Sequence, residues 1–234
     1  MRLNITKHIP NFITCLNLFS GCVSCVMAFQ GAYLYAALFM YLAAVFDFLD
    51  GMTARLLNAY SRIGKELDSL SDMVSFGIAP GFILFSWMQT IAPDRLFLPY
   101  LAFLIPVSSA LRLATFNIDD RQAISFIGLP TPANAIFIAS LISYVSLLEK
   151  PDFLSDIVSN VWVIITLIIV LSFLQNSNLP MFSLKFKNLT WRDNKTCYIF
   201  LILSLALLII FQLAAIPLII VLFILMSLFL YLKK

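Results

Sequence analysis

The sequence predicts an all-α protein: a polytopic transmembrane helical bundle of about eight spans, with both termini cytoplasmic. Its 234 residues are 62% hydrophobic and only 12% charged, whereas a soluble domain carries about 25% charged residues. The apolar runs are long, rich in Leu, Ile and Phe, and do not alternate with polar residues. They therefore predict membrane helices of about 20 residues and not barrel strands of about 10. No polar stretch exceeds about 20 residues, so we expect no soluble domain.

The first helix is predicted over residues 11–29, where Pro10 and Asn11 open it. Its apolar stretch is longer than the core of a secretory signal, which is about 7–15 residues. A second span follows almost at once, after a tight turn at Gln30 and Gly31. We therefore expect the first helix to be retained in the protein.

The remaining helices are separated by polar or Pro-containing connections. They are predicted over residues 32–58, 68–91, 96–117, 133–148, 157–177, 196–213 and 216–232. The first six helices and a basic loop form one predicted core over residues 1–195, and residues 196–234 add two C-terminal helices. The segment from Gly128 to Pro132 predicts a rigid turn before the fifth helix.

The basic residues test this arrangement, because cytoplasmic loops carry an excess of Lys and Arg. With the N-terminus inside, thirteen of the fifteen basic residues lie on the cytoplasmic side: Arg2, Lys7, Arg55, Arg62, Lys65, Arg112, Arg121, Lys185, Lys187, Arg192, Lys195, Lys233 and Lys234. Only Arg95 and Lys150 lie outside. The eight-span prediction therefore agrees with the charge distribution.

Four aspartates, Asp47, Asp50, Asp68 and Asp72, stand out in this apolar chain. A carboxylate at membrane depth costs roughly 2.5–3.5 kcal/mol on insertion scales. Asp47 and Asp50 lie about 60° apart on one helix, and Asp68 and Asp72 are four residues apart on the next. Two antiparallel helices would direct all four carboxylates into one small volume at the cytoplasmic end.

This arrangement predicts a site for divalent cations. Oxygen ligands without a nearby His or Cys favour Mg²⁺, Mn²⁺ or Ca²⁺ over zinc. Four carboxylates suit two ions, an arrangement that often serves phosphoryl chemistry. Gly51 and Ala54 leave room for a ligand beside the acids, and Arg55 adds a cation suited to a phosphate. The alternative is a set of acids at helix ends that are solvated by water.

The stretch Asp47-x-x-Asp50-Gly51-x-x-Ala54-Arg55, continued by Gly64, Asp68 and Asp72, resembles the signature of the CDP-alcohol phosphatidyltransferases at every defined position. These membrane enzymes use an alcohol to displace CMP from a CDP-linked lipid. The resemblance implies that the four aspartates are metal ligands, with two bound ions, Mn²⁺ or Mg²⁺, and that Asp72 is also the general base. It implies CDP-lipid contacts for Asn11, Thr14, Asp50, Gly51, Ala54, Arg55 and Gly64. From the residues alone, Asn11 and Thr14 are a helix-capping pair first and nucleotide contacts second.

Other segments resemble the phosphatidylserine synthase branch of that family. They are residues 68–80, 9–14, 110–117 and 128–132. The resemblance implies CDP-diacylglycerol and L-serine as substrates and a homodimer, although no dimer motif is visible. We expect a bacterial inner membrane, with the active site at the cytoplasmic face, where the charge distribution places the aspartates. Nucleic acid is not expected as a partner. Contacts to serine or phosphate are predicted for Ser69, Ser75, Arg112, Lys185 and Lys187.

Several alternatives stay open at this level. Arg112 is also explained by a side chain that reaches lipid headgroups, and Lys185 and Lys187 by attraction to anionic lipids. The acceptor alcohol could instead be glycerol phosphate or inositol phosphate. A transporter is the alternative outside the enzymes, because acids inside a membrane also mark transport paths.

Overall fold

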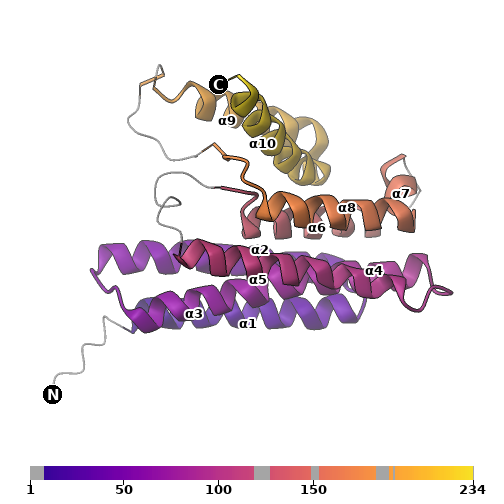
Figure 1. The fold of residues 1–234 in the computed structure, drawn as a ribbon, viewed down its shortest axis with the longest axis horizontal. Helices are drawn as coiled ribbons and strands as arrows, with labels where there is room; N and C mark the ends of the chain where they lie inside the picture. The colour runs from indigo at the N-terminus through magenta and orange to yellow at the C-terminus, as the bar shows by residue number, and fades with distance from the viewer. Residues whose placement is uncertain (1–7, 119–126, 149–152, 183–189, 192, 234) are drawn as a thin grey trace.

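The computed structural model describes residues 8–118, 127–148, 153–182, 190–191 and 193–233 (Figure 1). Within these ranges the chain is almost entirely helical, and the one strand-like contact is an isolated bridge between Ile127 and Pro180. The helical elements are α1 (Ile9–Phe29), α2 (Tyr33–Leu56), α3 (Arg62–Asp72), the π-helix η2 (Met73–Ile78), α4 (Ala79–Ile91), the 3₁₀ helix η3 (Leu98–Phe103), α5 (Leu104–Ile118), α6 (Thr131–Ser146), α7 (Phe153–Val158), α8 (Val161–Asn176), α9 (Lys195–Phe211), the 3₁₀ turn η5 (Gln212–Ala214) and α10 (Ala215–Leu232).

Five helical stretches among the described residues are long and apolar enough to cross a membrane, and the predicted all-α polytopic class is confirmed. They are Ile9–Phe29, Tyr33–Leu56, Arg62–Ile91, Leu98–Ile118 and Lys195–Leu232. The last stretch bends at Gln212, where φ is 48°, and so divides into α9 and α10. Two shorter apolar helices are α6 and α8. The number of spans and the side of the termini stay predictions.

Helices α1 and α2 form a closely packed hairpin. Gly31, with φ of 75°, makes the predicted tight turn between them. The buried face of α1 is lined by small residues, including Ser20, Gly21 and Ser24, and the Ser24 hydroxyl donates to the Ala36 carbonyl of α2 at 2.7 Å. Small residues let two helix backbones approach closely. Such close packing stabilises helix pairs in a membrane, where the hydrophobic effect contributes little to helix association.

The third helix begins earlier than predicted. It starts at Arg62 instead of residue 68 and continues through η2 to Ile91. The hydroxyl of Ser61 caps its first turn by accepting from the Gly64 amide at 2.9 Å. The prediction was wrong because it followed the apolar run. This first turn and a half is mostly polar and mostly exposed, and a capped helix needs no apolar run to begin.

The predicted helix over 157–177 is also divided differently. Residues 153–158 form the short helix α7, and α8 begins only at Val161, after a break at Ser159 and Asn160. The Asn160 side chain accepts from the Trp162 amide at 3.0 Å and so caps α8. A capping side chain accepts hydrogen bonds from the backbone N–H groups of the first turn, which have no carbonyl partner within the helix.

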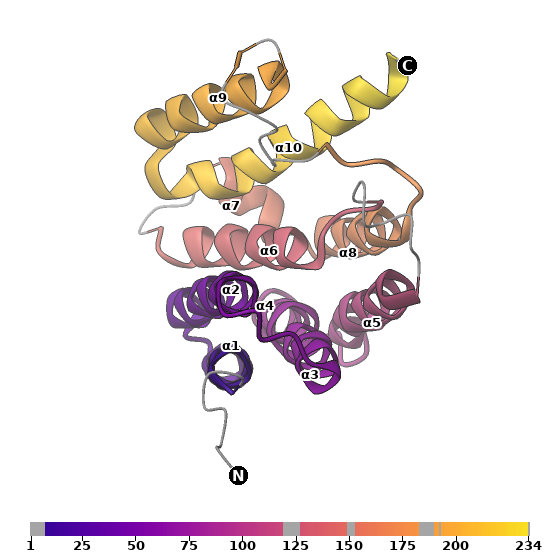
Figure 2. The same ribbon diagram turned by 90° about the vertical axis from the view of Figure 1, so that its left-hand side faces the viewer.

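The helices are arranged in layers (Figure 2). Helices α1 to α5 form one group, α6 and α8 lie against it, and α9 and α10 form the outermost pair. Helix α6 contacts both α2 and α10, which makes it the central element, and eleven of its residues are buried. The predicted turn before α6 is held by Gly128, whose φ is 75° and whose amide donates to the Leu179 carbonyl at 2.9 Å.

Candidate active site

Three of the four aspartates form a compact cluster. Asp47 and Asp50 lie near the end of α2, and Asp68 lies on α3. Each offers a carboxylate oxygen, and these oxygens lie within 4.8 Å of one another. Asp50 is buried and its Oδ2 has no hydrogen-bond partner within the described chain. The sequence predicted that all four carboxylates would lie together, and the structure shows this for three of them.

Asp72 lies one turn further along α3, beside the cluster but outside the three-carboxylate group. The Asn17 side-chain amide of α1 donates to its Oδ1 at 3.3 Å. Asp47 and Asp68 are close enough to interact with it electrostatically. Asp72 therefore differs from the other three acids, because a neutral amide on α1 orients its carboxylate.

Two serines hold Asp72 in this position by joining its helix to α1. The Ser71 hydroxyl donates to the Thr14 carbonyl at 3.2 Å, and the Ser75 hydroxyl donates to the Asn17 carbonyl at 3.0 Å. Gly21 permits this approach, because a Cβ there would lie only 2.8 Å from the Ser75 Cα. The π-helix that begins at Met73 directly follows Asp72, and such segments occur frequently at functional sites.

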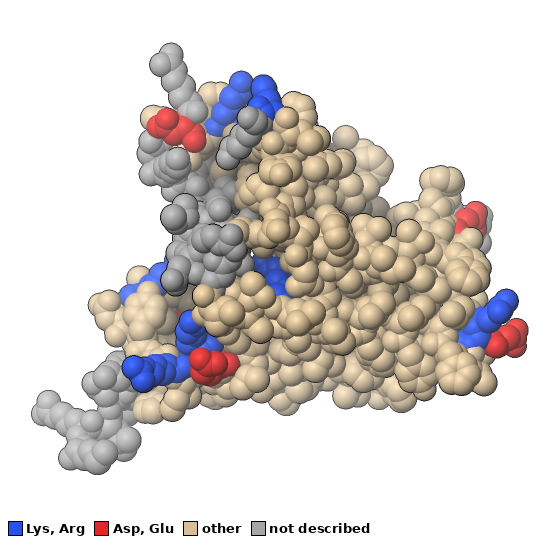
Figure 3. All heavy atoms as spheres, viewed as in Figure 1, with Lys and Arg blue, Asp and Glu red and all other residues tan. Residues whose placement is uncertain are grey.

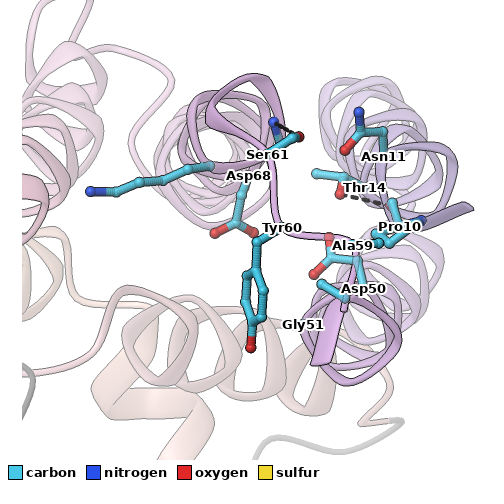
Figure 4. Close-up of a pocket in the computed structure, with 12 residues that line it drawn as sticks. Pro10, Asn11, Thr14, Asp50, Gly51, Ala59, Tyr60, Ser61 and Asp68 are labelled. Carbon is cyan, nitrogen blue, oxygen red and sulfur yellow. Dashed lines mark hydrogen bonds between the residues drawn. The ribbon is translucent and has the colours of Figure 1, made fainter. Parts of the chain in front are cut away.

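A pocket opens beside the cluster, between α1, α2 and α3 (Figure 4). Asn11 and Thr14 come from α1, and the carboxylates of Asp50 on α2 and Asp68 on α3 face the same space. The lining residues are Pro10, Asn11, Thr14, Asp50, Gly51, Ala54, Ala59, Tyr60, Ser61, Gly64, Lys65 and Asp68. The cavity volume of about 230 Å³ is below the roughly 300–1,000 Å³ typical of pockets that enclose a whole ligand, so it would hold part of a larger molecule.

Six of the seven residues predicted to contact a CDP-lipid line this pocket. The exception is Arg55, whose Nε donates to the Gly51 carbonyl at 3.0 Å along the same helix. The space beside Gly51 is open, since a Cβ there would meet only the Arg55 side chain at 3.7 Å. At Gly64, by contrast, a Cβ would lie 2.9 Å from the Asn11 Oδ1, so this glycine lets α1 and α3 approach each other.

The sequence did not single out Tyr60, Ser61 and Lys65, which also line the pocket. Lys65 lies one turn before Asp68 on α3, and its ammonium group donates to the Asn117 carbonyl of α5 at 3.4 Å. It supplies a positive charge on a wall otherwise rich in carboxylates. Its spacing from Asp68 would have revealed it if the helix had been predicted to begin at Arg62.

The residues predicted to contact serine or phosphate are scattered. Ser69 accepts from the Asn117 amide at 2.9 Å, and Ser75 is fully buried and bonded to α1. Lys185 and Lys187 lie outside the described residues. Arg112 on α5 is 6% exposed, so it does not reach toward lipid headgroups, and its Nη1 donates to the Thr131 hydroxyl at 2.9 Å.

The cluster fits a hard divalent cation. Its donors are all carboxylate oxygens, which Mg²⁺ and Mn²⁺ prefer, and a buried carboxylate oxygen without a partner leaves a ligand position free. Asp47, Asp50 and Asp68 would hold the ion. Fold and site together define a helical membrane protein with a group of carboxylates suited to a divalent metal ion, beside an open pocket.

Comparison with known proteins identifies the family. The family profile of the CDP-alcohol phosphatidyltransferases matches residues 7–174, which is more than two thirds of the chain. The protein therefore belongs to the CDP-alcohol phosphatidyltransferase family. The matched region contains all four aspartates, the pocket and Arg112.

Several relatives carry the name CDP-diacylglycerol–serine O-phosphatidyltransferase. The protein of Helicobacter pylori is 30% identical over 207 residues, which cover 88% of this chain and 84% of the relative. That of Bacillus subtilis is 37% identical over 126 residues, 54% of this chain and 70% of the relative. That of Mycobacterium leprae is 36% identical over 143 residues, 58% of this chain but only 46% of the relative's own length.

Proposed function

We propose that the protein transfers the phosphatidyl group of CDP-diacylglycerol to the hydroxyl of L-serine, with phosphatidylserine and CMP as products. The observation that carries the proposal is the group of three carboxylates beside a pocket that six of the seven expected CDP-lipid residues line. The names of the relatives in H. pylori, B. subtilis and M. leprae support serine as the acceptor.

The residues of the cluster would act on the diphosphate. Asp47, Asp50, Asp68 and, at its edge, Asp72 would hold a pair of divalent ions, Mn²⁺ or Mg²⁺, which would neutralise the charge that develops on the leaving CMP. Gly51 and Ala54 would let the CDP group lie against α2. Lys65 would pair with phosphate oxygens at the edge of the pocket.

Asp72 is proposed as the general base. It would accept the proton of the serine hydroxyl while the serine oxygen forms a bond to the phosphorus on the lipid side of the diphosphate. The bond between that phosphorus and the bridging oxygen breaks, and CMP leaves with the oxygen. The transfer is proposed to be direct, because the residues around Asp72 include no activated Ser, Cys or His nucleophile among those described.

The site is proposed to lie at the cytoplasmic face of a bacterial inner membrane. The positive-inside distribution of Lys and Arg supports the cytoplasmic face. A homodimer is an expectation from the family alone.

Release of CMP by the purified protein tests the proposal. CDP-diacylglycerol is supplied with Mn²⁺ or Mg²⁺, and serine, glycerol phosphate and inositol phosphate are compared as acceptors. We expect release with serine. Release with another acceptor alone would refute serine as the substrate, and no release with any acceptor would refute the enzymatic proposal. Trapping of a phosphatidylated protein without serine would refute direct transfer.

A further inference from the structure

Helices α9 and α10 form a hairpin at the outside of the molecule (Figure 2). They follow the region that the family profile matches, which ends at residue 174, and no residue of the candidate active site lies on them. Helix α10 packs against α6, whereas α9 packs chiefly against α10. The hairpin is therefore joined to the rest of the described chain mainly through α10, and its function is separate from the site around the aspartates.

A groove of about 480 Å³ lies between these two helices, and it is larger than the pocket beside the carboxylates. Along α9 its lining residues extend from Lys195 to Leu203, and along α10 from Leu225 to Lys233. Each of these distances is eight residues, or about 12 Å of helix. Because the two helices of the hairpin are antiparallel, both lysines lie at one end of the groove and both leucines lie at the other.

The protein covers a different side of the hairpin with its own side chains. The ring of Phe182 lies 5.5 Å from that of Phe200 on α9 and 4.9 Å from that of Phe223 on α10, centroid to centroid. Both of these helix residues are buried.

The apolar residues of the groove are not covered in this way. Leu203, Leu225 and Phe229 are 42%, 57% and 65% exposed. The described part of the chain therefore leaves the groove open to the surrounding lipid.

The charged end of the groove is positive. Lys195 and Lys233 are both exposed there, and no Asp or Glu is among the described residues that line the groove. The acid nearest to Lys195 in the sequence is Asp193, and its Oδ2 accepts a hydrogen bond from the Thr190 hydroxyl at 2.8 Å. The two ammonium groups are therefore complementary to an anion at this end of the groove.

The dimensions of the groove match one leaflet of a membrane. The hydrocarbon core of a bilayer is about 30 Å thick, so one leaflet contributes about 15 Å, and the groove extends about 12 Å from its lysines. A phospholipid anion has a phosphate at one end and apolar chains at the other, which is the polarity of the groove. A soluble anion would leave the apolar walls uncovered, and a membrane helix of a second copy would not neutralise the two lysines.

We propose that the groove between α9 and α10 binds one anionic diacyl phospholipid. Lys195 and Lys233 hold its phosphate, and its acyl chains lie along the groove toward Leu203 and Leu225. The lipid comes from the leaflet that the distribution of basic residues predicts to be cytoplasmic. This site is separate from the pocket between α1, α2 and α3, so the inference does not depend on the proposed function.

Binding of fluorescent phosphatidylglycerol to the purified full chain in a neutral detergent tests the charged end. We expect saturable binding, measured by anisotropy, that the double variant Lys195→Gln/Lys233→Gln weakens at least tenfold. The affinity for phosphatidylcholine, which has no net charge, should change less than twofold. The matched control is Arg62→Gln/Arg95→Gln, which removes two exposed charges outside the groove and should change neither affinity by more than twofold.

A pair of substitutions on α9 tests the apolar part of the groove. Leu203→Trp places a large ring in the groove, so it should weaken phosphatidylglycerol binding at least fivefold while the melting temperature without added lipid stays the same. Leu205→Trp is the control, because Leu205 is also exposed but lies two residues further, about 200° around the helix, and does not line the groove. It should leave phosphatidylglycerol binding unchanged.

Three other results would overturn the lipid site. Equal affinity of the wild-type protein for phosphatidylglycerol and phosphatidylcholine would show that the lysines select no anion. Displacement of the fluorescent lipid by inorganic phosphate alone would show that the apolar groove contributes nothing. If Leu203→Trp altered the molecular mass in analytical ultracentrifugation but left lipid affinity unchanged, the groove would be an interface between copies of the chain instead.

Discussion

Asp72 differs from the three clustered aspartates in what surrounds it. Asp47, Asp50 and Asp68 face one another across α2 and α3, where mutual repulsion favours a bound cation. Asp72 receives a hydrogen bond from Asn17 and is close enough to Asp47, Asp68 and Arg112 to interact with them electrostatically. Asp47, Asp50 and Asp68 are therefore proposed to act as ion ligands, and Asp72 is proposed to act both as a ligand at their edge and as the base.

Substitution of Asp72 by Asn tests this division. Because the amide keeps the size of the side chain but cannot act as a base, we expect kcat to fall by about 100-fold or more. Binding of CDP-diacylglycerol, measured by equilibrium binding, should be largely retained. Asp156→Asn, at an exposed position on α7, is the control and should leave turnover unchanged. Unchanged turnover of Asp72→Asn would rule out Asp72 as the base.

Removal of divalent ions tests the three-carboxylate cluster. Excess chelator should abolish CMP release, and Mn²⁺ or Mg²⁺ should restore it, because oxygen-only donors bind these ions. Asp68→Asn should require a higher ion concentration for half-maximal rate, since it replaces one charged ligand. Activity that survives in chelator at the wild-type rate would contradict a metal-dependent site.

At the scale of the elements, glycine serves two different purposes near the site. Gly21 brings α1 against η2, where Ser75 and Ser71 fasten the helix that carries Asp72. Gly51 lies on α2 beside open space in the pocket. One glycine therefore supports the packing of helices, and the other leaves room for a ligand.

Alanine at these two glycines should have opposite effects. Gly21→Ala places a methyl group against the Ser75 backbone, and overpacking of this kind costs about 1–3 kcal/mol, so the melting temperature should fall. Gly51→Ala should keep or raise the melting temperature, because Ala favours the helix by about 1 kcal/mol. It should lower kcat/KM for CDP-diacylglycerol, by up to about 100-fold if the lipid is displaced by 1 Å. Similar melting curves and kinetics for the two variants would contradict this assignment.

For the whole molecule, the distribution of charge predicts the orientation in the membrane. On the face shown in Figure 3, most charged side chains lie at the two ends of the long axis, with an apolar band between them. Asp94 and Arg95, in the connection after α4, are predicted to lie outside, whereas Lys233, after α10, is predicted to lie inside.

Cysteine labelling measures this orientation. In a chain whose four native cysteines are replaced, Asp94→Cys should react with a membrane-impermeant maleimide on intact cells. Lys233→Cys should react only after the cells are permeabilised. The reverse pattern would show that the predicted orientation, and the cytoplasmic site with it, is wrong.

The sequence predicted most of the fold because membrane helices follow from long apolar runs. It misplaced the start of α3 by six residues and missed the break at Asn160, since side-chain caps determine both boundaries. It also missed Lys65, and it placed Arg112 and Ser75 together as contacts of serine or phosphate. In the structure Ser75 is bonded to α1, whereas Arg112 contacts α6.

By itself, the sequence determined the membrane class, the acidic pairs and the family signature, because helical periodicity and short spacings are local properties of the chain. Only the tertiary structure decided that three aspartates cluster while the fourth contacts Asn17, and that Arg112 is buried against Thr131. Asn17 and Asp72 are separated by 55 residues, and Arg112 and Thr131 by 19. Their contacts depend on how α1 packs against α3 and α5 against α6, and no local pattern in the chain encodes that packing.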